Sequence, residues 1–391
     1  MTLSPAVARL LNLGHAVDHM FLLIFATAVT SIAPEFGFDR WEDLLPYSAG
    51  AFLMFGLGSV PAGRLGDLWG RRNMMVIFFF GMSASALLCA ATQNAWQMAA
   101  ALVLLGAFSA IYHPVGIPML VQHSPNPGAT IGLNGLVGNL GIALAAILTG
   151  FMVKFLGWRM AFIVPALMCL VCGLLFLRWS EPETESPAKR QGGAKVGLSP
   201  ELLARLFLVM TFTAISGSLL FNFTTNGNGQ LLRERFVGLV EDPAHLGSLL
   251  AGVYAVASLA QVVVGRLIDR FALKPLYFCI VLLQIPAFLL AANAQGWLLF
   301  WLQIGFMVTI FGAIPFTDAM IVRYVDDSMR SRVSGMRLAV SFGISSLAVY
   351  VLGPVVKAAG FANLLFVMAG IAACTAAFVL LLPADPVAPS R

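Results

Sequence analysis

Charged side chains are scarce in this sequence. Only 10% of the 391 residues are Asp, Glu, Lys or Arg, whereas 59% are hydrophobic and the mean hydropathy is +0.89. A soluble globular domain carries about 25% charged and about 45–50% apolar residues. A chain this apolar has too few polar residues to cover a water-facing surface. The composition therefore excludes an ordinary soluble protein and predicts a polytopic membrane protein.

Cysteines and catalytic motifs are also sparse. The five cysteines all lie within apolar stretches, which indicates small apolar residues of membrane helices rather than a disulfide framework. The sequence contains no His-Glu-x-x-His, no P-loop and no Gly-x-Ser-x-Gly motif. A membrane-embedded enzyme is therefore disfavoured, and no cofactor is expected. A passive channel or a transporter-like sensor stays open as a further class.

Long apolar stretches dominate the chain. A helix needs about 20 mostly apolar residues to cross the hydrocarbon core of a bilayer, and its backbone polar groups must be satisfied internally. The sequence predicts an all-α membrane protein with twelve transmembrane helices, the first of them retained rather than cleaved as a signal peptide. The twelve stretches are 9–32, 46–63, 74–92, 97–119, 130–153, 160–178, 203–224, 247–264, 275–293, 298–320, 334–356 and 361–382.

Basic residues are distributed unevenly between the loops. With the N-terminus inside, seventeen Lys and Arg residues fall on the cytoplasmic side and six on the outer side. The positive-inside rule therefore predicts a multi-pass protein of the cell inner membrane with both termini in the cytoplasm. This topology accounts for the net charge of +5, so no nucleic-acid partner is expected. The expected partners are the lipid bilayer, a small-molecule substrate and protons, and we expect a monomer.

The chain divides into two similar parts. Residues 179–202 form a polar stretch rich in Pro, Gly, Ser and charge, which predicts a cytoplasmic linker between a six-helix half at 1–178 and another at 203–391. The segment GRLGDLWGRR at 63–72 recurs as GRLIDRFALK at 265–274. An internal repeat of half the chain length is typical of secondary transporters.

These features resemble the major facilitator superfamily over the whole chain. Its signature loop between helices two and three matches five residues of the first repeat, and the GWRMAF segment at 157–162 is also typical of it. The resemblance implies that this loop locks the cytoplasmic side in one state. In the second copy, Ala272 and Leu273 replace the equivalents of Gly70 and Arg71. The predicted gating residues are Gly63, Asp67, Gly70, Arg71 and Arg72.

A narrower resemblance is to the bacterial fosmidomycin-resistance group of drug exporters. The segments AIYHPVGIP at 110–118 and GLVGNLGIALAAIL at 135–148 are similar to its motifs in helices four and five. GHAVDH at 14–19 resembles its first-helix motif, in which the acid stands one position later than Asp18. The group also has Glu where this chain has Val115. The resemblance implies export of a small organic solute.

Ionisable residues inside the predicted spans are the main candidates for function. His15, Asp18 and His19 stand at i, i+3 and i+4, so they share one face of the first helix, and Asp18 lies near mid-membrane. In the superfamily fold, helices one, four, seven and ten line the central cavity, which also brings in His113 and Asp318. Ionisable groups in a membrane are costly and commonly mark proton or substrate pathways. We predict that Asp18, His15, His19 and His113 couple transport to protons.

Other interpretations of these residues stay open. His15 and His113 could instead satisfy backbone carbonyls in the packed bundle, and Asp318 could belong to a surface ion pair near Arg323. The i, i+4 spacing of His15 and His19 also suits a metal ion, with Asp18 and His113 as further ligands. The predicted substrate cavity contains Tyr112, Asn139, Asn222, Asn226 and Asp318.

The sequence as a whole predicts a proton-coupled secondary transporter that exports a small organic solute by alternating access. A proton-coupled uptake symporter would use the same residues. Transport of a metal ion or a metal chelate through the His and Asp cluster is the other alternative.

Overall fold

Every regular element in the described residues is helical. The computed structural model describes residues 3–121, 127–182, 200–268, 270–324 and 327–382. Its long helices are α1 (Pro5–Ile32), α3 (Ala49–Trp69), α4 (Arg71–Ala91), α5 (Ala95–Ser109), α7 (Pro127–Phe155), α8 (Trp158–Trp179), α9 (Pro200–Arg235), α10 (Pro243–Ile268), α11 (Leu273–Ala291), α12 (Gly296–Tyr324) and α13 (Asp327–Val379). The short elements are α2 (Trp41–Leu44), α6 (Ile117–Val121), two 3₁₀ turns (Pro34–Phe36 and Leu45–Ser48) and a π turn (Tyr112–Gly116). The all-α prediction is confirmed.

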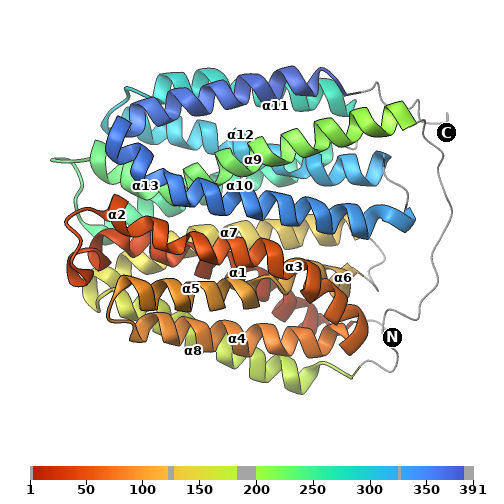
Figure 1. Cartoon of the computed structure of the whole chain (residues 1–391), viewed down its shortest axis with the longest axis horizontal. Coiled ribbons are helices and arrows are strands. Elements are labelled where there is room, and N and C mark those ends of the chain that lie inside the picture. Colours follow the sequence, from red (N-terminus) through yellow and green to blue (C-terminus); the bar gives the residue numbers. More distant parts are fainter. Residues whose placement is uncertain (1–2, 122–126, 183–199, 269, 325–326, 383–391) are drawn as a thin grey trace.

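Eleven helices within the described ranges are long and apolar enough to cross a membrane. Large apolar side chains such as Leu283, Leu290 and Trp301 are 59–66% exposed on their outer faces, as lipid-facing side chains should be. The last of these helices is interrupted at Gly360, whose φ of 76° and ψ of 165° are not helical. Figure 1 shows the chain reversing direction there. The single element α13 therefore contains the predicted span 334–356 and most of the predicted span 361–382.

Local signals in the sequence set several helix ends. The Ser4 hydroxyl accepts a hydrogen bond from the Val7 backbone N–H at 3.3 Å, and Pro5 fills the first turn of α1. Asn94 caps α5 in the same way through the Gln97 N–H at 3.0 Å. Gly70 connects α3 to α4 with a φ of 93°, a backbone conformation that favours glycine. The signature loop therefore contains a sharp turn that a larger residue would strain.

The helices form two groups that lie side by side. In Figure 1 the N-terminal group (α1–α8, red to yellow) lies below the C-terminal group (α9–α13, green to blue). We call the end of the bundle where α1 begins the proximal end and the end where α1 finishes the distal end. Between the groups, α7 packs on α10, α3 packs on α13, and α1 contacts α9. The predicted linker, residues 179–202, falls mostly outside the described residues.

The two groups are in close contact at the distal end. Gly247 of α10 and Gly353 of α13 lie so near the backbone carbonyls of Ala146 and Glu42 that a Cβ at either glycine would collide with them. Helix backbones approach this closely only through small residues. The distal end is therefore closed in this conformation.

Two ion pairs bridge the groups at this closed end. Lys154, at the end of α7, lies 2.6 Å from Asp242, which precedes α10. Lys357, in α13 just before the reversal at Gly360, lies 2.6 Å from Asp43 in α2. The hydrogen bond from Lys154 holds the pKa of Asp242 below its ordinary value. Because the folded pKa is lowered, this pair holds at neutral pH and is lost only as the pH falls through the carboxyl range.

We expect the double substitution Lys154→Gln and Lys357→Gln to favour opening of the distal end. An exposed ion pair contributes little to stability by itself. Losing both should raise the ratio of open to closed molecules by roughly 2- to 30-fold. The measurement is the distance distribution between spin labels placed on the exposed residues Asp39 and Glu241, one in each group.

Arg159→Gln is the matched control. Arg159 also pairs with a carboxylate at the distal end, at 2.5 Å from Glu35, but both residues belong to the N-terminal group. Its loss should leave the spin-label distances unchanged. An equal response of the control and the double variant would contradict a specific closing role for the bridging pairs.

Candidate functional site

A buried carboxylate lies at the centre of the N-terminal group. Asp18 stands halfway along the 28-residue helix α1, and its side chain is fully buried. Its Oδ1 accepts a hydrogen bond from the Ser109 hydroxyl at the end of α5. Its Oδ2 is buried without a hydrogen-bond partner and lies 3.8 Å from His113 Nε2. One oxygen is thus held in place while the other faces an imidazole.

His15 is held by a network between α1 and α7. Its Nδ1 lies 2.9 Å from the backbone oxygen of Asn134, and its ring stacks on Tyr112 at 4.8 Å between centroids. The Asn134 amide donates to the Tyr112 hydroxyl at 2.8 Å, and that hydroxyl donates to the Leu11 carbonyl at 2.7 Å. These bonds fix the ring plane and leave His15 Nε2 buried without a hydrogen-bond partner.

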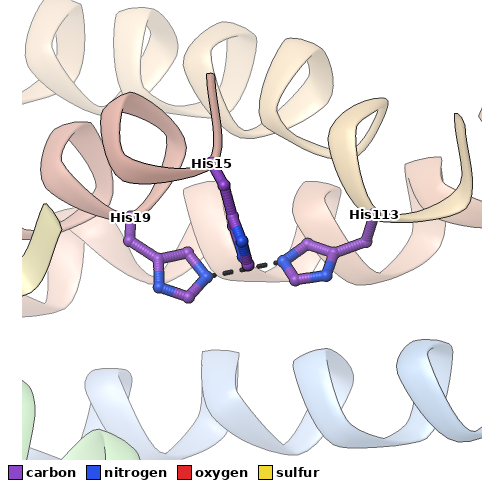
Figure 2. Close-up of side chains that lie close together, drawn as sticks. All are labelled: His15, His19 and His113. Atoms are coloured by element: carbon purple, nitrogen blue, oxygen red, sulfur yellow. Dashed lines mark hydrogen bonds between the residues drawn. The ribbon is translucent and has the colours of Figure 1, made fainter. Parts of the chain in front are cut away.

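The other two histidines converge on the same point. His19 lies one turn after His15 on α1, and its Nε2 is 3.4 Å from His113 Nε2. Figure 2 shows the rings of His15, His19 and His113 close together, with a dashed line for the bond between His19 and His113. One nitrogen of each ring lies within 4.8 Å of one nitrogen of each other ring. The structure therefore brings together all four residues predicted for proton coupling.

An irregular turn directs His113 toward α1. Residues Tyr112–Gly116 form a π turn that contains Pro114, which has no N–H to donate to a regular helix. Such widened turns are frequent at functional sites. The turn separates α5 from α6, and the rings of its neighbouring residues Tyr112 and His113 both contact the ring of His15, at 4.8 and 4.9 Å between centroids. Tyr112, predicted to line the cavity, is fully buried and supports His15 instead.

An aromatic pair connects the cluster to the C-terminal group. Phe55 of α3 stacks on Phe342 of α13 with 3.9 Å between centroids. The ring of His113 lies 5.7 Å from Phe55 and 6.1 Å from Phe342. Sequence reasoning missed this pair because nothing marks these two among 30 phenylalanines. It also missed Ser109, whose contact with Asp18 depends on how α5 packs.

The predicted cavity amides fall into different surroundings. Asn222 donates to the Ser345 hydroxyl at 2.7 Å, and Asn226 donates to the Asn222 carbonyl at 3.1 Å. Both bonds lie within the C-terminal group, and no hydrogen bond among the described residues joins these amides to the histidines. Asn139 of α7 is buried, and its amide nitrogen has no hydrogen-bond partner. Asp318 belongs to α12, but its side chain lies outside the described residues.

The signature loop lies at the proximal end. Arg72 donates from Nε to the Ser180 carbonyl and from Nη2 to the Leu177 carbonyl, each at 2.9 Å, and so caps the C-terminal end of α8. A Cβ on Gly63 would stand 3.2 Å from Pro114, next to the π turn. Asp67 is half-buried in the last turn of α3, and Arg71 begins α4. The loop therefore contacts the element that carries His113.

Comparison with known families agrees with this architecture. The family model for the Major Facilitator Superfamily matches residues 11–240 and 236–391. This chain belongs to the major facilitator superfamily. It is a multi-pass membrane protein of a transporter family rather than of an enzyme family, and its relatives include efflux and multidrug transporters.

Three curated relatives illustrate the range of similarity. The Probable actinorhodin transporter of Streptomyces coelicolor is 31% identical over 36% of this chain and 25% of its own length. The Efflux pump terJ of Aspergillus terreus is 25% identical over 76% of this chain and 57% of its own length. The Multidrug resistance protein MdtG of Citrobacter koseri is 23% identical over 72% of this chain and 70% of its own length. The alignment thus spans less than two thirds of the first two relatives.

A solved structure has the same fold. It is a bacterial homolog of the human lysosomal transporter Spinster in an inward-facing and occupied conformation. The TM-score is 0.72, with 96% of this chain and 94% of that chain covered, at 16% sequence identity. At this identity the likeness concerns the fold alone.

We expect Gly138→Ala to disturb the cluster and lower the stability of the protein. A Cβ on Gly138 of α7 would stand 2.5 Å from Cε1 of the fixed His15 ring. Overpacking of this kind costs about 1–3 kcal/mol, which outweighs the ~1 kcal/mol that alanine gains over glycine in a helix. The measurement is thermal unfolding of the purified protein in detergent micelles.

Gly132→Ala is the matched control for this prediction. Gly132 lies on the same helix, but a Cβ there would meet no atom within 4 Å. This variant should keep or raise the melting temperature. If Gly138→Ala melts at or above the temperature of Gly132→Ala, the close packing of His15 on α7 is not a constraint.

Proposed function

We propose that this chain is a proton-coupled secondary transporter that exports a small organic solute by alternating access. The observation that carries the proposal is the arrangement of Asp18: a carboxylate fully buried in mid-helix, with one free oxygen facing His113. A buried carboxyl group without a full set of partners is costly, and such groups in membrane helices commonly bind and release protons. The three adjacent imidazoles supply further proton acceptors.

The architecture suits rocking of the two helix groups about this central site. We count α13 as two spans divided at Gly360, which gives the twelve spans and two six-helix halves, 1–178 and 203–391, that the sequence predicts. With both termini in the cytoplasm, the proximal end faces inward and the closed distal end faces outward. The conformation would then be closed to the outside, and the loop at 63–72 would act as the gate of the cytoplasmic side. We propose that the working unit is a monomer of the inner membrane.

Export is favoured over uptake by two observations. The motifs at 110–118 and 135–148 resemble those of the fosmidomycin-resistance group of exporters. Several curated relatives are named as efflux or multidrug resistance proteins. A proton-driven uptake symporter would use the same buried carboxylate, and the direction of the solute gradient in a transport assay separates the two.

We predict that Asp18→Asn abolishes gradient-driven transport but leaves exchange of substrate for substrate. Asparagine keeps the shape of the side chain and its bond from Ser109, but it cannot carry a proton through the cycle. A potential of 100 mV acting on one charge is worth about 2.3 kcal/mol, enough for roughly fifty-fold accumulation. Uptake is measured in proteoliposomes with and without a proton gradient, using the compound that most stabilises the purified protein in a thermal screen.

Asp39→Asn is the control, since Asp39 is an exposed acid at the distal end. It should accumulate substrate as the unmodified protein does. If Asp18→Asn also concentrates substrate to the same level, Asp18 does not couple transport to protons, and His19 and Asp318 become the groups to test.

A further inference from the structure

Three imidazoles meet within the buried site. His15 and His19 come from successive turns of α1, and His113 comes from the π turn that follows α5. Their ring centroids are 4.6, 4.9 and 5.7 Å apart. His19 and His113 are joined by a hydrogen bond between their rings. His15 Nε2 takes no part in it and has no hydrogen-bond partner. A hydrogen-bonded histidine cluster alone therefore does not account for the arrangement.

We propose that His15, His19 and His113 coordinate a divalent transition-metal ion of the Zn²⁺ class, and that this ion, bare or carried by a small organic chelator, is the cargo. Coordination is inferred from the geometry of the three rings. The statement that the ion is cargo rests on the proposed function as a transporter. This proposal restricts the transported solute to one that carries a metal ion able to bind imidazole.

The spacing of the nitrogens suits such an ion. Zinc binds imidazole nitrogen at about 2.0–2.1 Å in tetrahedral sites, which places two ligand nitrogens roughly 3.3–3.4 Å apart. The Nε2 atoms of His19 and His113 are 3.4 Å apart. The widest separation in the set is no more than 4.8 Å, so small rotations of the His19 and His113 rings toward the fixed His15 ring would bring all three nitrogens to one ion. Imidazole is a favoured ligand of Zn, Cu, Fe and Ni.

The protonation of His15 also suits a metal ligand. A carbonyl oxygen can only accept a hydrogen bond, so the contact with the Asn134 backbone oxygen places the hydrogen on Nδ1. The lone pair is then on Nε2, which is buried and lacks a hydrogen-bond partner. Metal-binding histidines typically donate their other N–H to a carbonyl or carboxylate in this way.

A negative charge stands beside the three neutral ligands. Asp18 Oδ2 lies 3.8 Å from His113 Nε2 and has no hydrogen-bond partner. Asp18 is not among the residues whose ligand atoms converge, but a carboxylate at this distance can offset the charge of a divalent cation from beside its ligands. Two buried acceptor atoms near His113, Nε2 of His15 and Oδ2 of Asp18, thus lack hydrogen-bond partners. A cation bound by the histidines would give the His15 nitrogen a partner and would offset the nearby carboxylate.

The test is titration of the full-length purified protein with Zn²⁺ by calorimetry in detergent, after removal of any polyhistidine tag. We expect one ion per chain. His15→Gln and His113→Gln should each weaken binding by at least about 10–100-fold, the loss seen even for an outer-shell partner of a metal site. His245→Gln is the matched control: His245 is 74% exposed at the distal end, and its substitution should leave binding unchanged.

A spectroscopic measurement on the unmodified protein tests the site without relying on variants that could misfold. Co²⁺ in place of Zn²⁺ gives visible absorption that reports nitrogen ligation and tetrahedral geometry in the unmodified protein. Absence of one-to-one binding, absence of these bands, or equal affinity in His15→Gln, His113→Gln and His245→Gln would each overturn the proposal.

Two further experiments distinguish a bare ion from a chelated one and test metal binding separately from transport. Zn²⁺ is offered alone and as its citrate complex, and stronger binding of either identifies the form that the site accepts. Radioactive zinc exchange in proteoliposomes tests whether the bound ion is cargo, and binding without exchange overturns that part. Zinc binding in detergent needs no proton gradient, so it can be observed even if proton-driven transport fails. Equally, proton-driven transport can be observed even if zinc does not bind.

Discussion

A carboxyl group in the middle of a membrane-spanning helix constrains everything packed around it. Asp18 cannot be solvated by water or lipid where it lies, so the surrounding helices must supply its partners. Ser109 provides one hydrogen bond, which requires the end of α5 to approach the centre of α1. The π turn then aims His113 at the second oxygen. The irregularity of this helix pair thus follows from the need to stabilise one charge-bearing group.

The ionisable chemistry is distributed unequally between the two helix groups. Asp18, Ser109 and the three histidines all belong to the N-terminal group, whereas the C-terminal group contributes the ring of Phe342 and the nearby charge of Arg337 to their surroundings. The buried amides and hydroxyls of α9 and α13 are bonded to one another on the other side. The two groups therefore hold different polar residues, and most of the candidate chemistry lies in the N-terminal group.

Much of this could be predicted from the sequence because hydropathy and helical periodicity are local properties. The spans, and the shared face of His15, Asp18 and His19, follow from runs of apolar residues and the i, i+3, i+4 spacing. The partners of these residues do not. The bonds from Ser109 to Asp18 and from His15 to Asn134 depend on the rotation of α5 and α7 against α1. Asn222 looked like a cavity residue but bonds to Ser345, since one sequence does not show which neighbour an amide meets.

The stack of Phe55 on Phe342 has a kinetic consequence. The two rings belong to different helix groups, so they must part and meet again whenever the groups rock at this level. An aromatic pair contributes about 0.5–1.5 kcal/mol beyond its buried area. That is enough to set the dwell time of this conformation within roughly a 2- to 10-fold range. Neither ring carries a titratable group. In the proposed rocking cycle their contact therefore affects how often the groups rock, and it leaves the number of protons carried in each cycle unchanged.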